Sequence, residues 1–97
     1  MKEPMLKTAV ATILKIDKDC VVSRLNEAME SLGDSDSELI LDFSSVRRVD
    51  PSALRAMDKL VSLADDKDVK IGLRGVNVDI YKVLKLVKLA SRFSILN

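Results

Sequence analysis

The chain has 97 residues, with 16 Lys and Arg against 15 Asp and Glu, and a net charge of +1. This length holds one hydrophobic core, so we expect residues 1–97 to form a single domain. A hydrophobic content of 47% with almost no net charge excludes a disordered chain. The balanced charge and the low aromatic content, 3%, argue against nucleic-acid binding.

The sequence contains no His and a single Cys, Cys20. Without His there is no Ser-His-Asp triad, no Cys-His pair and no imidazole metal site. Cys20 lacks the base that usually activates a thiol, and a small residue near the start of a helix is the simpler interpretation. We therefore expect no enzyme, no cofactor and no metal. A lone Cys suits a reducing compartment.

The first residues, Met1 to Pro4, include an acid and a proline where a signal peptide needs an apolar run. No apolar stretch approaches the roughly 20 residues that a membrane-spanning helix requires. We therefore expect a cytoplasmic protein without a membrane span.

The first half of the chain alternates apolar runs with polar connectors. Residues 7–16 are β-branched and almost uninterrupted, which predicts a strand buried on much of both faces. Residues 17–19 are polar and can form a turn and a helix start. An amphipathic helix is then predicted, ended by Gly33. Its apolar positions are Val21, Val22, Leu25, Ala28, Met29 and Leu32.

The second half repeats this alternation. Residues 38–43 read as a central strand, and Asp50 followed by Pro51 is a strong helix start. Residues 69–73 alternate as a strand, Gly75 breaks the chain and Asn77 is a predicted N-cap. Residues 93–96 can add a short strand. The helix after Asp50 is expected to bury Leu54, Met57, Val61 and Ala64, with Ala53, Leu60 and Leu63 beside them. The last helix is expected to bury Ile80, Val83, Leu84 and Val87.

This order, β-α-β-α-β-α-β, predicts an α/β fold with a mostly parallel sheet of about four strands and about three helices. We expect the helices mainly on one face of the sheet. The other face would be partly exposed or used for association, so a homodimer through it stays open.

A basic stripe is predicted on the last helix, where cations recur at spacings of three and four residues. It is either a solvated face or an electrostatic contact with an acidic partner or anionic headgroups. Its members are Lys82, Lys85, Lys88 and Arg92.

Residues 39–54 carry the strongest functional signal. A buried strand leads into a loop that presents Asp50 and Ser52 at the N-terminus of a helix. Such a terminus has unsatisfied N–H groups and a partial positive charge, which would suit a phosphate on a nearby hydroxyl. The alternative is plain capping by Asp50.

This segment resembles the STAS family, the sulfate-transporter and anti-sigma-factor-antagonist domains. The strand ends Leu41-Asp42-Phe43-Ser44, near the family's Asp-Leu-Ser, and Asp50-Pro51-Ser52-Ala53-Leu54 is similar to its Asp-Ser-Ser-Gly-Leu motif. The resemblance extends over residues 39–96. Before them only the element order matches, with room for one leading strand rather than two. It implies a small α/β domain that acts by binding a protein.

The motif departs from the family at two positions. In phosphorylated antagonists the switch hydroxyl directly follows the motif Asp, and here that residue is Pro51. Ser52 matches the second small residue and points elsewhere, because a helix turns by about 100° per residue. Ala53 replaces the motif glycine. The resemblance thus implies a domain without the standard phosphoserine switch, with Ser52 as a substitute acceptor at most.

Two partner classes follow from the resemblance. One is a GHKL-type anti-sigma factor or kinase. The other is a transporter ATPase, because the small STAS subunit of Mla-type phospholipid ABC transporters is also similar. That subunit has Arg-Val-Asp before the motif helix and a Gly-Val-Asn turn before its last helix, as this chain has. The expected partner-binding residues are Arg47, Arg48, Asp50, Pro51, Ser52, Ala53, Arg55 and Asp58, with Ser62 within reach of a partner.

Overall fold

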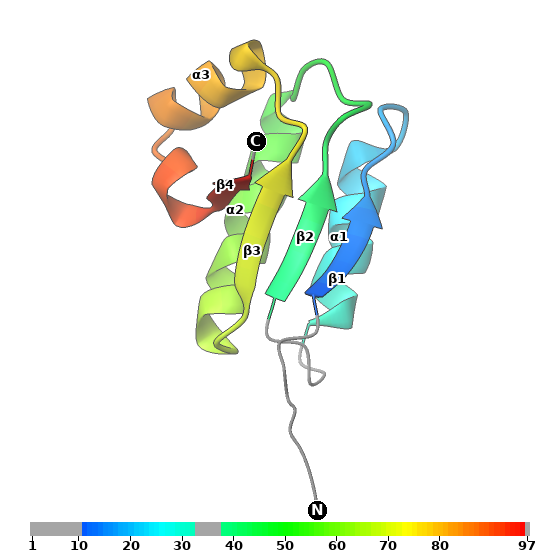
Figure 1. Ribbon diagram of the computed structural model, residues 1–97, viewed down its shortest axis with the longest axis vertical. Helices are drawn as coiled ribbons and strands as arrows, with labels where there is room; N and C mark the ends of the chain where they lie inside the picture. The colour runs from blue at the N-terminus through cyan, green and yellow to red at the C-terminus, as the bar shows by residue number, and fades with distance from the viewer. Residues whose placement is uncertain (1–10, 33–37, 97) are drawn as a thin grey trace, which may run out of the picture.

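A computed structural model describes residues 11–32 and 38–96 (Figure 1). Its one sheet has four parallel strands in the order β1-β2-β3-β4, which confirms the predicted α/β fold. A short 3-10 helix, η1, was not expected. The elements are β1 (Ala11–Lys15), α1 (Val21–Ser31), β2 (Glu38–Asp42), α2 (Pro51–Asp66), β3 (Lys70–Arg74), α3 (Val78–Leu86), η1 (Ala90–Arg92) and β4 (Ser94–Leu96).

Both α1 and α2 lie behind the sheet in the view of Figure 1 and pack against each other. Parallel strands joined in sequential order by right-handed crossovers place their helices on the same face. The prediction that the helices lie mainly on one face is therefore confirmed. The carboxyl ends of β1, β2 and β3 meet at one edge, where the connecting loops begin.

The core lies between the sheet and these two helices. Phe43, just after β2, is completely buried, and every second residue of β2 points inward. α2 also buries Ala56, which the sequence pattern did not single out, whereas Leu63, expected beside the apolar face, is exposed. Further core residues are Leu25, Ala28, Leu39, Leu41, Met57, Leu60, Val61, Ala64, Ile71 and Leu73.

The prediction that the first strand is buried on both faces is wrong for its described part. The side chain of Ile13 is 52% exposed, because no described helix covers its side of the sheet. Ile40 and Leu96 lie on the same open side, close to Gly72. Residues 7–10 of the predicted strand, the question of a second leading strand and the C-terminal Gly33 of the first helix lie outside the described residues.

The predicted basic stripe is divided. α3 ends at Leu86, and Lys88 adopts a left-handed backbone conformation with φ of +66° that turns the chain into η1. Arg92 consequently lies in η1, and its guanidinium faces α2, 3.0 Å from Asp65 and 3.9 Å from Asp58. The placement of Arg92 on the last helix is therefore wrong.

Candidate functional site

The chain leaves β2 through a defined turn. The backbone N–H of Ser44 donates to Oδ1 of Asp42 at 2.9 Å, and the N–H of Val46 donates to the carbonyl of Phe43. Hydrogen bonds from Ser44 hold the pKa of Asp42 below its ordinary value of 3.8, and the positive charges of Arg74 and Lys15 add to the effect. The turn gives the residues that follow a fixed starting direction.

A second contact holds those residues from the side of α3. The side-chain amide of Asn77 donates to the backbone carbonyls of Val46, at 3.4 Å, and Arg47, at 3.0 Å. Its Oδ1 accepts from the N–H of Ile80 at 2.8 Å, which confirms the predicted N-cap of α3. One side chain therefore fixes both a helix start and the loop after β2.

Gly75 makes this approach possible. It has φ of +74°, and a Cβ at this position would lie 2.9 Å from the backbone of Ser44. Only glycine combines this conformation with so close a contact. The turn Gly75-Val76-Asn77, noted in the sequence as a family feature, thus brings the β3–α3 connection against the β2–α2 connection.

Asp50 begins α2 as predicted. Its Oδ1 accepts from the N–H of Ala53 at 2.8 Å, and Pro51 occupies the first turn. Pro51 and Ser52 are exposed, and the Ser52 hydroxyl lies 3.5 Å from Nη2 of Arg55, at the outer limit of a hydrogen bond. Ala53 is only 2% exposed, so its methyl group packs inside the fold. Capping by Asp50 is confirmed.

A hollow of about 690 Å³ separates this helix start from the β1–α1 connection. A neighbouring hollow of about 580 Å³ continues past Arg47 to Ser44 and Ser45. The loops that follow adjacent parallel strands begin at the same edge of the sheet, and binding crevices commonly form at such edges. The larger hollow is lined by Lys18, Asp19, Cys20, Val21, Val22, Ser23, Arg48, Val49, Asp50 and Ala53.

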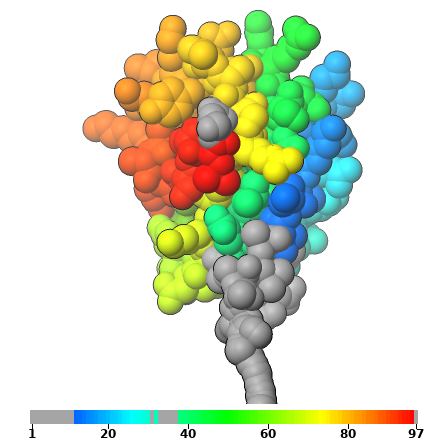
Figure 2. All heavy atoms as spheres, in the orientation of Figure 1, coloured from blue at the N-terminus to red at the C-terminus, as the bar shows by residue number. Residues whose placement is uncertain are grey.

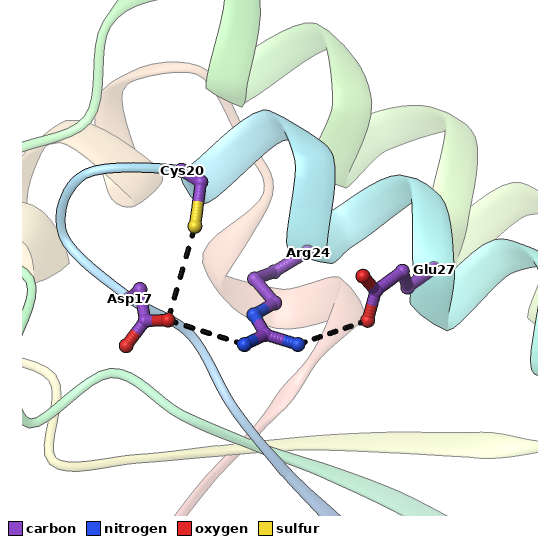
Figure 3. Close-up of polar contacts among 4 residues, drawn as sticks. All are labelled: Asp17, Cys20, Arg24 and Glu27. Carbon is purple, nitrogen blue, oxygen red and sulfur yellow. Dashed lines mark hydrogen bonds and ion pairs between the residues drawn. The ribbon is translucent and has the colours of Figure 1, made fainter.

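The start of α1 lines the far side of this hollow. Figure 3 shows the polar contacts around this helix start. Asp17 accepts from Nη2 of Arg24 at 3.2 Å and from the thiol of Cys20 at 3.8 Å. The hydrogen bond to Asp17, followed by that to Glu27, raises the pKa of Arg24. Cys20 is thus held in a structural turn. Parallel strands end at the same edge of a sheet. The predicted parallel order could therefore have indicated that residues 18–20, which follow the first strand, lie beside the predicted site.

The predicted site residues fall on two sides of α2. Arg48, Asp50 and Ala53 line the hollow toward α1. A smaller hollow of about 240 Å³, toward η1, is lined by Leu54, Arg55, Asp58, Val87 and Leu89.

Arg47 borders the second hollow, and Pro51 and Ser52 are exposed at the start of α2.

In residues 11–32 and 38–96 no three His, Cys, Asp or Glu side chains gather in a way that could hold a metal ion. No helix within these ranges is long and apolar enough to cross a bilayer.

Several solved structures have this fold. A sulfate transporter family protein from Wolinella succinogenes matches with a TM-score of 0.75 and 18% identity, over 88% of this chain and 74% of its own. The STAS domain of a SulP transporter from Vibrio cholerae matches with a TM-score of 0.71 and 16% identity, over 95% of this chain and 77% of its own. A structure of the stressosome, described as a signal integration and transduction hub, matches with a TM-score of 0.72 and 22% identity, over 97% of this chain and 88% of the matched chain.

A search of curated proteins found no match. The family model of the STAS domain, however, matches residues 5–97, which is further toward the N-terminus than residues 39–96, where the motifs lie. The motif at Asp50, the turn at Gly75 and the four parallel strands agree with this match. The chain belongs to the STAS domain family.

Proposed function

We propose that this chain is a non-catalytic regulatory module that binds a protein through residues 47–54 and the first turns of α2. The observation that carries the proposal is the way the fold holds this segment. Asn77 clamps its first carbonyl, at Arg47, and Asp50 caps the helix into which it leads. Charged side chains at Arg47, Arg48, Asp50 and Arg55 remain exposed.

A segment held in this way loses little conformational freedom on binding. Pro51 fixes one backbone angle in the first turn of α2, which lowers the ordering cost further. The hollows on either side of α2 offer space for side chains of a partner, and Arg48 and Arg55 stand at their borders. Ala53 supports this surface from inside, because its methyl group is buried.

Pro51 cannot accept a phosphate, and it occupies the position of the family's switch hydroxyl. We therefore propose that the domain binds its partner constitutively or under a different signal. Ser52 supplies a polar contact. Its hydroxyl lies beside Arg55, which would meet a phosphate added there. As a phosphate acceptor Ser52 is the less favoured choice, since it stands one residue after the switch position.

The favoured partner is a GHKL-type anti-sigma factor or kinase, and the similarity to a stressosome structure supports a signalling role. The alternative is a STAS subunit of a lipid-transport ABC complex that binds the transporter ATPase. Two observations support the alternative. Two of the similar structures come from transporters, and the transporter role does not require a phosphorylatable residue at the position that Pro51 occupies.

The test is capture of the partner by the tagged chain from its native lysate, followed by reconstitution with the purified partner. Ser52→Glu is expected to lose the complex, because bulk and charge enter the contact surface. Ser91→Glu places the same change on an exposed serine of η1 and is the matched control. An acid near the N-terminus of α2 is favourable for the helix, so unfolding does not explain a loss of binding.

The identity of the partner then separates the two functions. A kinase-like ATP-binding protein that Ser52→Glu fails to capture supports the signalling module. A transporter ATPase or permease supports the accessory subunit. Equal affinity of the wild type and Ser52→Glu for the purified partner would show that residues 47–54 are not the contact surface.

A further inference from the structure

The outward side of α3 carries exposed apolar side chains among lysines. Successive helical residues turn by about 100°, so five positions share one side of this helix. The opposite side is buried through Ile80 and Leu84. We call the exposed side the α3 face; it consists of Val78, Tyr81, Lys82, Lys85 and Leu86.

The apolar members of this face are far from covered. Leu86 is 81% exposed and Val78 is 67% exposed, and Tyr81 and Val87 are also exposed. Val78 and Leu86 are eight residues apart, about 12 Å along the helix axis. Figure 2 shows α3, in yellow and orange, at the upper left corner of the molecule. An isolated exposed Leu is ordinary, but three large apolar side chains on one side of a short helix indicate contact with a surface.

The lysines of this region are not paired with acids of the described fold. No ion pair in the described part of the chain uses Lys82, Lys85 or Lys88. Arg92, in contrast, is taken up by Asp58 and Asp65 of α2. From Val78 to the end of the described chain there are four Lys and Arg against one acid, Asp79, which lies in the first turn of α3. The α3 face and Lys88 therefore complement a negatively charged surface.

The kinds of side chain favour lipid over protein as that surface. The cores of protein interfaces are depleted in Lys, and their strongest contacts come from Trp, Tyr and Arg. Helices that lie on membranes combine Lys with exposed aliphatic side chains, because the lysine stem lies among lipid while its ammonium stays with the headgroups. Tyr81 is typical of the same interface, and Nζ of Lys85 lies 5.7 Å from its ring centroid.

We propose that the α3 face and Lys88 dock this domain peripherally on an anionic lipid bilayer. Lys82, Lys85 and Lys88 contact the headgroups, and Val78, Tyr81 and Leu86 enter the headgroup boundary. This docking surface is separate from the protein-binding segment 47–54, and it can be tested without any protein partner.

The test is binding of the purified full chain to vesicles of phosphatidylcholine alone or of equal parts phosphatidylcholine and phosphatidylglycerol. The chain has one Tyr and no Trp, so its intrinsic emission comes from Tyr81 on the α3 face. We expect sedimentation with the anionic vesicles only, reversal by high salt, and protection of Tyr81 from acrylamide quenching on binding.

Variants locate the contact. Lys82→Glu with Lys85→Glu is expected to weaken vesicle binding by about tenfold or more. Lys67→Glu with Lys70→Glu makes the same change in net charge at the opposite end of the molecule and is expected to bind more strongly than the first pair. Leu86→Ser keeps the charge and the fold, since this side chain is mostly exposed, and is expected to weaken binding about fivefold.

Three results would overturn the proposal. The first is no binding to the anionic vesicles at low salt by a folded chain. The second is binding that leaves Tyr81 as accessible to acrylamide as before, which would place the contact on another face. The third is protection of Tyr81 by soluble poly-glutamate but not by vesicles, which would make an acidic protein surface the occupant.

Discussion

The side-chain amide of Asn77 donates to the backbone carbonyl of Arg47 across 3.0 Å, although the two residues are 30 positions apart in sequence. The same side chain caps α3 through its Oδ1. The segment proposed to bind a partner is therefore positioned by the helix that carries the proposed lipid-docking face. Substitutions at Asn77 can separate these two hydrogen-bonding roles.

Asn77→Asp keeps the cap and loses the donor to Val46 and Arg47, whereas Asn77→Ala loses both. We expect Asn77→Ala to lower the free energy of unfolding by about 2 kcal/mol, from one lost N-cap and the lost hydrogen bonds to Val46 and Arg47, of which the first, at 3.4 Å, is long. Asn77→Asp should lower it by about 1 kcal/mol. Urea unfolding measures both values. Hydrogen exchange at the Ile80 amide should accelerate only in Asn77→Ala. Wild-type stability of Asn77→Asp would show that the clamp contributes nothing.

A comparison of two glycines tests the close approach behind this clamp. Gly75→Ala places a Cβ 2.9 Å from the backbone of Ser44 at φ of +74°, and the backbone cannot move aside cheaply. We expect a loss of about 2–4 kcal/mol in unfolding free energy. Gly72→Ala is the matched control. Its nearest contact, also at 2.9 Å, is the end of the exposed Leu96 side chain, which can rotate.

The loss in Gly72→Ala should stay below about 1 kcal/mol. Thermal or urea unfolding of both variants gives the order. If Gly72→Ala proves the more damaging of the two, the turn at Gly75 is less constrained than its contacts with Ser44 indicate.

Local signals explain which parts of the fold could be predicted. Asp50 and Asn77 cap their helices through residues within the same turn, so the sequence pattern alone located both starts. The strands alternate with helices along the chain, which predicted the parallel sheet. The ends predicted for the last three strands lie within one residue of the ends of β2, β3 and β4.

Features that depend on distant residues escaped prediction. The exposure of Ile13 depends on which face of the sheet the helices cover. The position of Arg92 depends on the left-handed residue Lys88 and on acids of α2. The clamp by Asn77 depends on the approach of two loops. The cover over Ile13, the ion pairs of Arg92 and the clamp by Asn77 all depend on segments far away in the chain, and no local pattern indicates them.

The pKa of Asp42 gives a prediction about pH. Its pKa is lowered in the folded chain, chiefly by the hydrogen bonds from Ser44. The ionised form therefore adds stability that is fully present above the ordinary value of 3.8 and is lost as the pH falls through the lower folded value. Asp42→Asn can still accept from the Ser44 N–H but has no charge to lose.

We expect the wild type to exceed Asp42→Asn in unfolding free energy by about 1 kcal/mol at neutral pH. This difference should shrink as the pH is lowered below the ordinary pKa of 3.8. Other carboxylates titrate in both chains, so their effects cancel in the comparison. Urea unfolding of both chains over this range provides the measurement. A difference that is constant with pH would mean that Asp42 has the same pKa folded and unfolded.

The last prediction concerns the position after the motif Asp. Pro51→Ser supplies a hydroxyl where the resemblance to phosphorylated STAS antagonists places the switch. A phosphate there would lie at the N-terminus of α2, where N–H groups and the helix dipole stabilise negative charge. Replacing Pro51 should lower the free energy of unfolding by only about 0.5–1 kcal/mol, because the unfolded chain gains freedom.

If the captured partner is a GHKL-type kinase, Pro51→Ser incubated with it and ATP should gain one phosphate at position 51 and then release the partner. Pro51→Ala controls for loss of the proline and should bind without gaining phosphate there. Intact-mass measurement and peptide mapping follow the reaction. Phosphorylation of the wild type on Ser52 at the rate seen in Pro51→Ser would mean that the switch has moved by one residue rather than been lost, because Arg55, 3.5 Å from the Ser52 hydroxyl, would then serve as the phosphate's partner.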